Sequence, residues 1–270
     1  MAEELQQPLL LSRVHLMRAA CLFLAGQAAE ALQQSMEAER YEGLYLGEEQ
    51  PGEYYLRSTL RATRIGALLQ LSRFREARSE LQAAVQDARR TGSRAALLHL
   101  SLVSALDDIA QDQAQRSRER LELARAQLPA GRFGALHLLH LVAVLRVACA
   151  LGDYAWARAT IDEMWPQFER SLVRHSLFAV LAYGAHARYL LNQHVLSGAS
   201  GDPERLLRDD LRALHKLSDR VGPAMHTRFR ARLAYLRGDH ARAQELFEQH
   251  AEQCPRERFT DETERASWAR

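Results

Sequence analysis

Glycine, proline and β-branched residues are all scarce in this chain, with only 14 Gly and 7 Pro in 270 residues. Ala, Leu, Arg, Glu and Gln recur throughout, and these residues lose little free energy on entering a helix. No stretch alternates apolar with polar residues over the length of a strand, which argues against a doubly wound sheet with a nucleotide crevice. Because 47% of the residues are hydrophobic and 26% are charged, a core can form. The composition therefore predicts an all-α fold.

Cysteines and long apolar runs are also lacking. Cys21, Cys149 and Cys254 are isolated, so the chain offers neither a disulfide framework nor a CxxC metal site. No segment approaches the roughly 18 uncharged apolar residues of a membrane span, and the acidic start before the short apolar run 9–11 is unlike a signal peptide. We expect a cytoplasmic protein that is not associated with a membrane.

Neither sign of charge is in large excess, since the chain has 36 basic and 34 acidic residues. A net charge of +2 provides no global field for nucleic acid, so we expect no nucleic-acid partner. Lys216 is the only lysine, and we interpret the arginine preference mainly as the codon bias of a GC-rich genome.

Recognisable catalytic motifs are missing as well. The sequence has no GxSxG, no HExxH and no glycine-rich phosphate loop. His137 and His140 could hold a metal on one helix only if two further ligands converged, and the pair His250/Cys254 gives the same weak signal. Packing is the favoured interpretation of both pairs. For Asp107 and Asp108 we expect a solvated helix face. The sequence predicts no enzyme, no catalytic residues, no metal and no cofactor.

A repeating unit organises the chain. Five stretches share a template in which a small or polar residue is followed five positions later by Ala or Ser. They run over 26–31, 72–77, 112–117, 152–157 and 238–243. The turn residues are 46, 40, 40 and 86 positions apart, so a hidden unit is expected inside the last gap. That unit is predicted to contain a helix over 171–193, a loop over 195–201, Asp202 as N-cap and Pro203 at the first helical position.

Helix boundaries follow from the glycine and proline positions. Twelve helices are predicted, at about 8–25, 27–46, 53–71, 73–90, 94–111, 113–128, 133–151, 153–169, 171–193, 203–220, 223–237 and 239–253.

The Gly-Asp-Tyr-x-x-Ala turn at Gly152 and the Gly-Asp-His-x-x-Ala turn at Gly238 resemble the centre of a tetratricopeptide repeat (TPR). Phe247 and Pro255 stand at the offsets from the last repeat alanine that this family expects. The average period is near 42 residues here, against about 34 in the family. The resemblance implies a right-handed superhelix (α-solenoid) of about six antiparallel helix pairs. It would form one domain over 1–255, followed by a polar C-terminal tail or capping segment over 256–270.

In TPR proteins the first helix of each pair lines a concave groove, and this resemblance implies where a partner would bind. The candidate partner-binding residues are Arg13, Leu16, Phe23, His99, Leu102, Arg146, Arg228, Arg232 and Tyr235. The Lys/Asn pattern with which chaperone-binding members hold a peptide carboxylate is missing. The resulting prediction is a non-enzymatic adaptor or regulatory scaffold that binds a protein or peptide along its superhelix.

Arginine clusters are the most informative polar feature. Arg228 and Arg232 share one helix face in a stretch without carboxylates, which suits an anion or an acidic peptide. The alternative is that they pair with carboxylates of neighbouring helices. The carboxylates proposed for this pairing are Asp209, Asp210, Asp219 and Glu245. A second run of arginines, from Arg116 to Arg125, also contains glutamates, which reduce its net positive charge.

A second function stays open at the level of sequence. Similar long-helix repeats occur in the helical sensor arms of large bacterial transcription activators and beside some bacterial signalling kinases. The chain could therefore be a ligand-sensing arm of a larger bacterial regulator, in which a small molecule or peptide changes the pitch of the stack.

Overall fold

The computed structural model describes residues 8–44, 51–176, 178–198, 200–217 and 221–253. These residues form twelve α-helices and one short 3₁₀ helix, and they contain no strand. The predicted all-α fold class is confirmed, and so is the number of helices. None of the helices in this part of the chain is long and apolar enough to cross a membrane.

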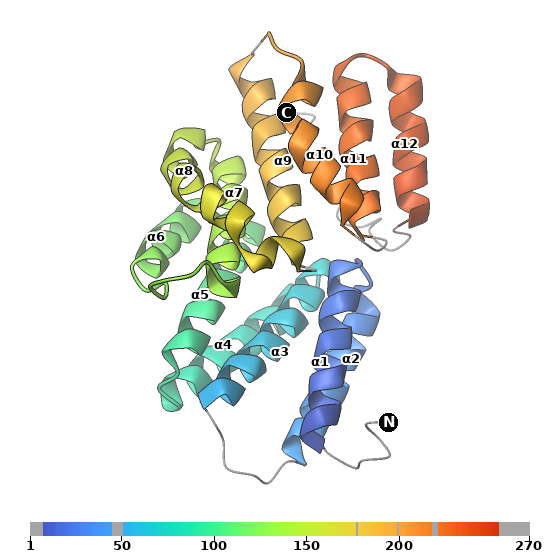
Figure 1. The fold of residues 1–270 in the computed structure, drawn as a ribbon. Helices are drawn as coiled ribbons and strands as arrows, with labels where there is room; N and C mark the ends of the chain where they lie inside the picture. The colour runs from blue at the N-terminus through green and yellow to red at the C-terminus, as the bar shows by residue number, and fades with distance from the viewer. Residues whose placement is uncertain (1–7, 45–50, 177, 199, 218–220, 254–270) are drawn as a thin grey trace. The chain divides into compact units, whose positions relative to one another are not determined.

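Contacts divide the chain into two compact units, and the boundary in the sequence lies between residues 107 and 108. The first contains α1 (Pro8–Leu24), α2 (Ala28–Gly43), α3 (Pro51–Gln70), α4 (Phe74–Arg90) and all but the last turn of α5 (Arg94–Ala110). In it, α1 packs on α2, α2 on α3 and α3 on α4 (Figure 1). The prediction of a single domain over 1–255 stays a prediction, and the predicted tail 256–270 lies outside the described residues.

The second unit follows the same plan of consecutive hairpins. Its elements are α6 (Ala114–Arg125), α7 (Ala135–Leu151), α8 (Tyr154–Arg170), η1 (Leu172–His175), α9 (Ala179–Ser197), α10 (Pro203–Lys216), α11 (Val221–Leu236) and α12 (His240–Gln253). Neighbouring helices pack in chain order from α6 to α8 and from α9 to α12, and α7 also packs directly on α9. This arrangement brings the first helices of three successive hairpins, α7, α9 and α11, together.

The repeated turns share one backbone conformation. All five template turn residues have positive φ angles, including the two that are not glycine, Ser72 (57°) and Asp112 (60°). A left-handed residue ends an α-helix because it lets the following amides turn back to the last carbonyls. Gln27 N and Arg73 N donate to the carbonyls five residues earlier, both at 2.9 Å. The template is therefore a helix-ending turn used five times.

The Ala or Ser that closes each template is buried where the second helix begins. Ala31, Ser117 and Ala157 are fully buried, and Ala77 and Ala243 are nearly so. Small side chains at these positions allow the two helices of a hairpin to approach closely. The positions four and seven residues later are buried too, such as Leu121 and Ala124 in α6, except that Phe247 in α12 is half-buried. One face of each second helix therefore builds the core.

The hidden sixth unit lies where the spacing predicts it. Gly198 has a positive φ of 60° and ends α9, and Asp202 caps α10 by accepting a hydrogen bond from Glu204 N at 3.1 Å, with Pro203 in the first turn. The predicted helix over 171–193 is wrong at its start, because α9 begins at Ala179. Ser171 and Ser176 are extended on either side of η1, and the hydroxyl of each donates to the carbonyl three residues earlier. Such bonds compete with helix formation.

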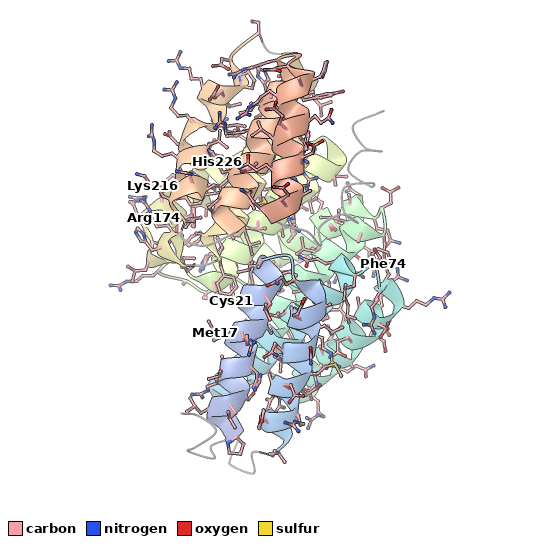
Figure 2. All side chains as sticks on the ribbon, turned by 90° about the vertical axis from the view of Figure 1, so that its right-hand side faces the viewer. Met17, Cys21, Phe74, Arg174, Lys216 and His226 are labelled. Atoms are coloured by element: carbon pink, nitrogen blue, oxygen red, sulfur yellow. The ribbon has the colours of Figure 1, made fainter. Side chains whose placement is uncertain are left out.

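The first helix, α1, is apolar on two opposite sides. Leu11, Leu16 and Leu24 are buried, with Leu16 packing beside Ala38 of α2 and Leu60 of α3. The opposite side carries exposed apolar residues, and Figure 2 shows Met17 and Cys21 on the outside of the helix.

Candidate functional site

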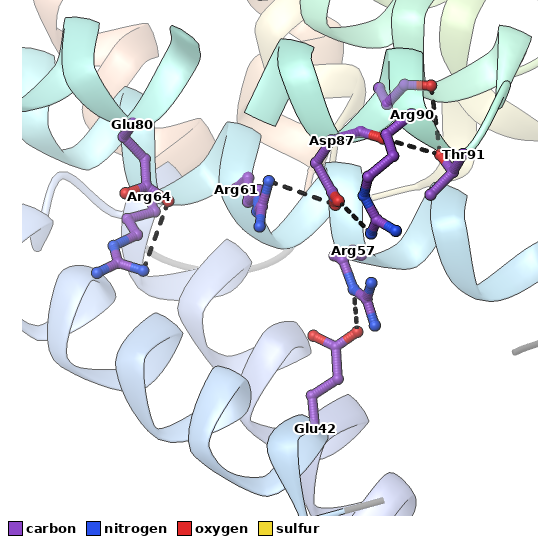
Figure 3. A network of polar contacts seen from close by, with 9 residues as sticks. Glu42, Arg57, Arg61, Arg64, Glu80, Asp87, Arg90 and Thr91 are labelled. Atoms are coloured by element: carbon purple, nitrogen blue, oxygen red, sulfur yellow. Dashed lines mark hydrogen bonds and ion pairs between the residues drawn. The ribbon is translucent and has the colours of Figure 1, made fainter. Parts of the chain in front are cut away.

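A network of arginines and carboxylates joins α2, α3 and α4 in the first unit (Figure 3). Arg57 and Arg64 lie on one face of α3 and bind carboxylates of α2, at 2.7 Å from Glu42 and 2.6 Å from Glu39. Because these arginines face carboxylates on the neighbouring helix, their first role is to hold α3 in place.

Asp87 of α4 is the centre of the other side of this network. It binds Arg90 at 2.8 Å and Arg61 of α3 at 3.6 Å. Burial by itself would raise the pKa of Asp87, but the hydrogen bond from Arg90 and the charge of Arg61 lower it below its ordinary value. Asp87 is therefore a carboxylate held ionised by arginines.

A recess lies beside this network, between α3, α4 and α5. Its volume is about 240 Å³ and includes space open to solvent, whereas small-molecule sites occupy roughly 300–1,000 Å³. Arg57, Ser58, Arg61, Asp87 and Thr91 are its polar lining. Its size and its charge-matched walls make it a poor candidate for a substrate pocket.

The arginine run of α6 is paired along its length. Asp108 accepts from Arg120 at 3.0 Å and lies 3.8 Å from Arg116, Arg118 reaches Asp153 at 2.8 Å, and Arg125 pairs with Glu163. The expectation of a solvated face for the two aspartates of α5 is wrong, because Asp107 and Asp108 are both buried. For Asp108 the reason is the arginine pairing from α6.

The histidine pairs behave as packing residues. Nε2 of His137 lies 3.1 Å from the Pro129 carbonyl, and Nε2 of His140 lies 3.1 Å from the Leu121 carbonyl. His250 likewise binds the Ala224 carbonyl at 3.0 Å, while Cys254 lies outside the described residues. Within the described ranges no group of three or more potential ligands could hold a metal ion.

A buried His–Asp pair between α9 and α10 was not predicted from the sequence. Nδ1 of His186 lies 2.8 Å from Asp210, and burial raises the pKa of Asp210 although His186 opposes this. The indole of Trp165 stacks on the His186 ring with 3.9 Å between ring centroids. Since Trp165 covers the imidazole, the pair is placed to join three helices rather than to meet a substrate.

The nine predicted groove residues fall into three groups. Leu16, His99 and Leu102 are buried in the first unit and are therefore not available to a partner, and Phe23 is half-buried against Gly66. Arg13 is exposed on α1, and Tyr235 is exposed on α11. The remaining three, Arg146, Arg228 and Arg232, belong to the second unit on α7 and α11.

Arg146, Arg188 and Arg232, from α7, α9 and α11, lie near enough to Cys149 for their charges to act on it, and we call these three together with Arg228 the arginine face. Burial raises the pKa of the Cys149 thiol to about 11, and the charges of Arg188, Arg146 and Arg232 act against this rise. Arg228 is one helical turn before Arg232 on the same side of α11. Arg146 is exposed, and the other three are half-buried. Three first helices thus contribute positive charge to one place.

Buried polar side chains of α8 and α9 lie in the surroundings of Cys149. Asn192 hydrogen-bonds to the Cys149 and Tyr154 side chains and lowers the pKa values of both, while burial raises that of Tyr154 to about 12. Oη of Tyr154 and Oδ1 of Asn192 have no further hydrogen bond of regular geometry within the described residues. These side chains therefore bind one another.

The described carboxylates that the sequence offered as partners of Arg228 and Arg232 have contacts with other residues. Asp209 binds Arg212 at 3.3 Å, and Glu245 binds Arg242 at 2.7 Å. Asp210 faces His186, as described above, and Asp219 lies outside the described residues. The pairing of Arg228 and Arg232 with carboxylates stays a prediction.

Sequence reasoning found Arg146, Arg228 and Arg232 but missed Arg188. Arg188 and Asn192 are four residues apart and so share one side of α9, a signal that the sequence does contain. Comparison of the chain with protein-family models, with curated proteins and with solved structures finds no match.

Proposed function

We propose that this protein is a non-enzymatic adaptor or regulatory scaffold that binds an acidic segment of a protein partner on the arginine face of its second unit. The frame we propose for this function is a TPR-like right-handed superhelix, in which α7, α9 and α11 line the inner side. The observation that carries the proposal is the packing of α7 and α11 on α9, which brings the charges of Arg146, Arg188 and Arg232 to act on Cys149.

The chemistry of the face suits carboxylates. Guanidinium groups bind carboxylates through paired N–H donors and stay charged at every physiological pH. Arg146 is exposed on α7, so a carboxylate of an acidic peptide could accept from its guanidinium group.

Features elsewhere in the described residues support a binding role over catalysis. The His186–Asp210 pair lies under Trp165, and burial raises the pKa of the Cys149 thiol to about 11, which leaves it protonated and a weak nucleophile at neutral pH. The recess in the first unit is too small for most substrates.

The test is binding of a fluorescein-labelled peptide of alternating Glu and Ala, with a Lys and Ala peptide of the same length as reference. The full chain should bind the glutamate peptide, and R228E/R232E should weaken that binding at least about tenfold, because two attractive charges become repulsive. Fluorescence anisotropy over a range of salt concentrations measures both affinities, and binding should weaken as salt rises.

A matched control separates this site from net charge. Arg205 and Arg208 are exposed on α10, the second helix of a hairpin in the same unit. R205E/R208E changes the net charge by the same amount and should leave the affinity nearly unchanged. Equal losses in the two double variants, or no binding of the glutamate peptide to the full chain, would overturn the proposal.

A further inference from the structure

The exposed side of α1 carries a continuous apolar stripe. Leu10, Val14, Met17 and Cys21 are all exposed, with 37%, 49% and 55% of the surface of the first three accessible. At about 100° per residue these four positions lie within an arc of about 60° on the helix. Single exposed apolar side chains need no explanation, but a stripe along a whole helix face marks an interaction site.

The spacing of the stripe is that of a coiled-coil seam. The four residues are separated by four, three and four positions, which is the alternation of a and d sites in a heptad. Leu10 and Met17 then occupy d positions, and Val14 and Cys21 occupy a positions. Such a narrow seam fits the knobs of a second helix, whereas helices that lie on membranes present a wider apolar face.

Two arginines border this seam at the positions that select a partner. In the same register Arg13 is a g residue and Arg18 is an e residue, one on each side of the stripe. Both are exposed, and neither has an ion pair or a hydrogen bond within the described part of the chain. The helix from Pro8 to Leu24 contains no Asp or Glu to balance them.

The charges disfavour a second copy of this chain as the occupant. In a parallel pair of α1 helices the g residue Arg13 would face the e residue Arg18 of the other copy, and in an antiparallel pair each arginine would face its own equivalent. Either arrangement places like charges together at the edge of the seam, which is destabilising.

We infer that α1 is a docking surface for an amphipathic helix of another protein, with apolar residues at its a and d positions and glutamate or aspartate at its e and g positions. The apolar stripe supplies the buried contact, and Arg13 and Arg18 select acidic flanks. This surface belongs to the first unit and is independent of the arginine face.

The experiment uses two synthetic 28-residue heptad peptides that share apolar a and d residues and carry either Glu or Lys at every e and g position. The Glu peptide repels itself and should bind the full chain, with the Lys peptide binding at least about tenfold more weakly. R13E/R18E should invert this preference, because the charges that select the partner are reversed. Fluorescence anisotropy with labelled peptides measures all four combinations.

The apolar contact is tested by V14Q/M17Q, which should abolish binding of both peptides without loss of thermal stability, since both residues are exposed. The matched control is Leu123→Gln, which changes an isolated exposed leucine of α6 and should leave binding intact. R228E/R232E should also leave heptad-peptide binding intact, which separates this surface from the arginine face.

Several outcomes would overturn the inference. Equal binding of the two peptides, or an unchanged preference in R13E/R18E, would remove the role of the arginines. Self-association of the full chain in light scattering that V14Q/M17Q abolishes would show that a second copy covers the stripe. Binding to phosphatidylserine vesicles that V14Q/M17Q abolishes, without binding of the Glu peptide, would assign the stripe to a membrane.

Discussion

A single small residue sets how closely the two helices of each hairpin approach. In the hairpin of α7 and α8 this residue is Ala157, which is completely buried just after the turn at Gly152. The same position is Ser117 in α6, also completely buried. A larger side chain would have to displace packed neighbours, because interiors are filled at crystal-like density.

Ala157→Leu should therefore destabilise the protein by about 1–3 kcal/mol through overpacking. Urea unfolding followed by circular dichroism measures the change. Ala155→Leu is the matched control, since Ala155 is exposed on the same helix and its substitution should cost little. Similar losses for the two variants would show that the hairpin contact is looser than described.

Residue-scale features were predictable where they depend on the backbone alone. The turn at Gly152 and the cap at Asp202 were both found, because positive φ angles and N-caps restrict the residue type strongly. The burial of Leu16, His99 and Leu102 was not found. An error of one position rotates a helical residue by about 100°, which is enough to exchange an inner face for an outer one.

Titration of buried histidines links single residues to the stability of whole helices. Burial lowers the pKa of His140 in α7 to about 4, while its Nε2 lies 3.1 Å from the Leu121 carbonyl of α6. His99 in α5 is buried too, and its pKa is also lowered to about 4. In both helices the folded state needs the neutral imidazole.

Acidification should therefore destabilise the protein between pH 6.5 and about pH 4. The folded pKa of His140 is below the ordinary value of 6.5, so the unfolded chain binds more protons in this range and stability falls as pH falls. His140→Gln keeps a hydrogen-bond donor but cannot titrate. It should reduce the slope of unfolding free energy against pH by at most about 1.4 kcal/mol per pH unit.

Urea unfolding at several pH values measures this slope. His240→Gln is the control, because His240 is exposed at the start of α12 and its replacement should leave the slope unchanged. A slope that is the same in His140→Gln and in the unsubstituted chain would contradict the role given to burial.

At the scale of elements, the predicted start of the helix over 171–193 is wrong because no strong helix breaker marks the irregular segment before α9. Nothing between 171 and 179 is Gly or Pro, so the sequence favours a continuous helix there. The hydroxyls of Ser171 and Ser176 instead bond to nearby carbonyls at 2.8 and 2.7 Å. The choice between this arrangement and a helix depends on tertiary packing, which the local sequence does not contain.

At the scale of the molecule, the arginine face shows that contacts between helices far apart in the sequence could not be predicted from the sequence alone. Arg146 and Arg232 were predicted from counting along single helices, but their approach to Arg188 requires α7, α9 and α11 to be brought together. Likewise, the burial of Asp108 depends on Arg120 from the next helix. Long-range partners of this kind are set by packing between hairpins.

Packing mainly between neighbouring helices also predicts how the molecule opens. In repeat proteins stability is approximately a sum of the stabilities of the units and of their nearest-neighbour contacts. Here α1 packs on α2 and α2 on α3, and the contacts of the chain fall into two units. A substitution that disrupts the packing of one hairpin in the first unit should therefore destabilise the helices of that unit and not those of the second unit.

Ala31→Leu tests this expectation, because Ala31 is completely buried near the start of α2. Overpacking there should speed amide hydrogen exchange in α1, α2 and α3 by about tenfold or more, and it should leave exchange in α9 to α12 unchanged. Hydrogen-exchange mass spectrometry measures both regions in one sample. Ala29→Leu, at an exposed position of the same helix, should change neither region. Faster exchange of equal size in both regions would mean that the chain opens as one cooperative body, because local opening could not then be separated from global unfolding.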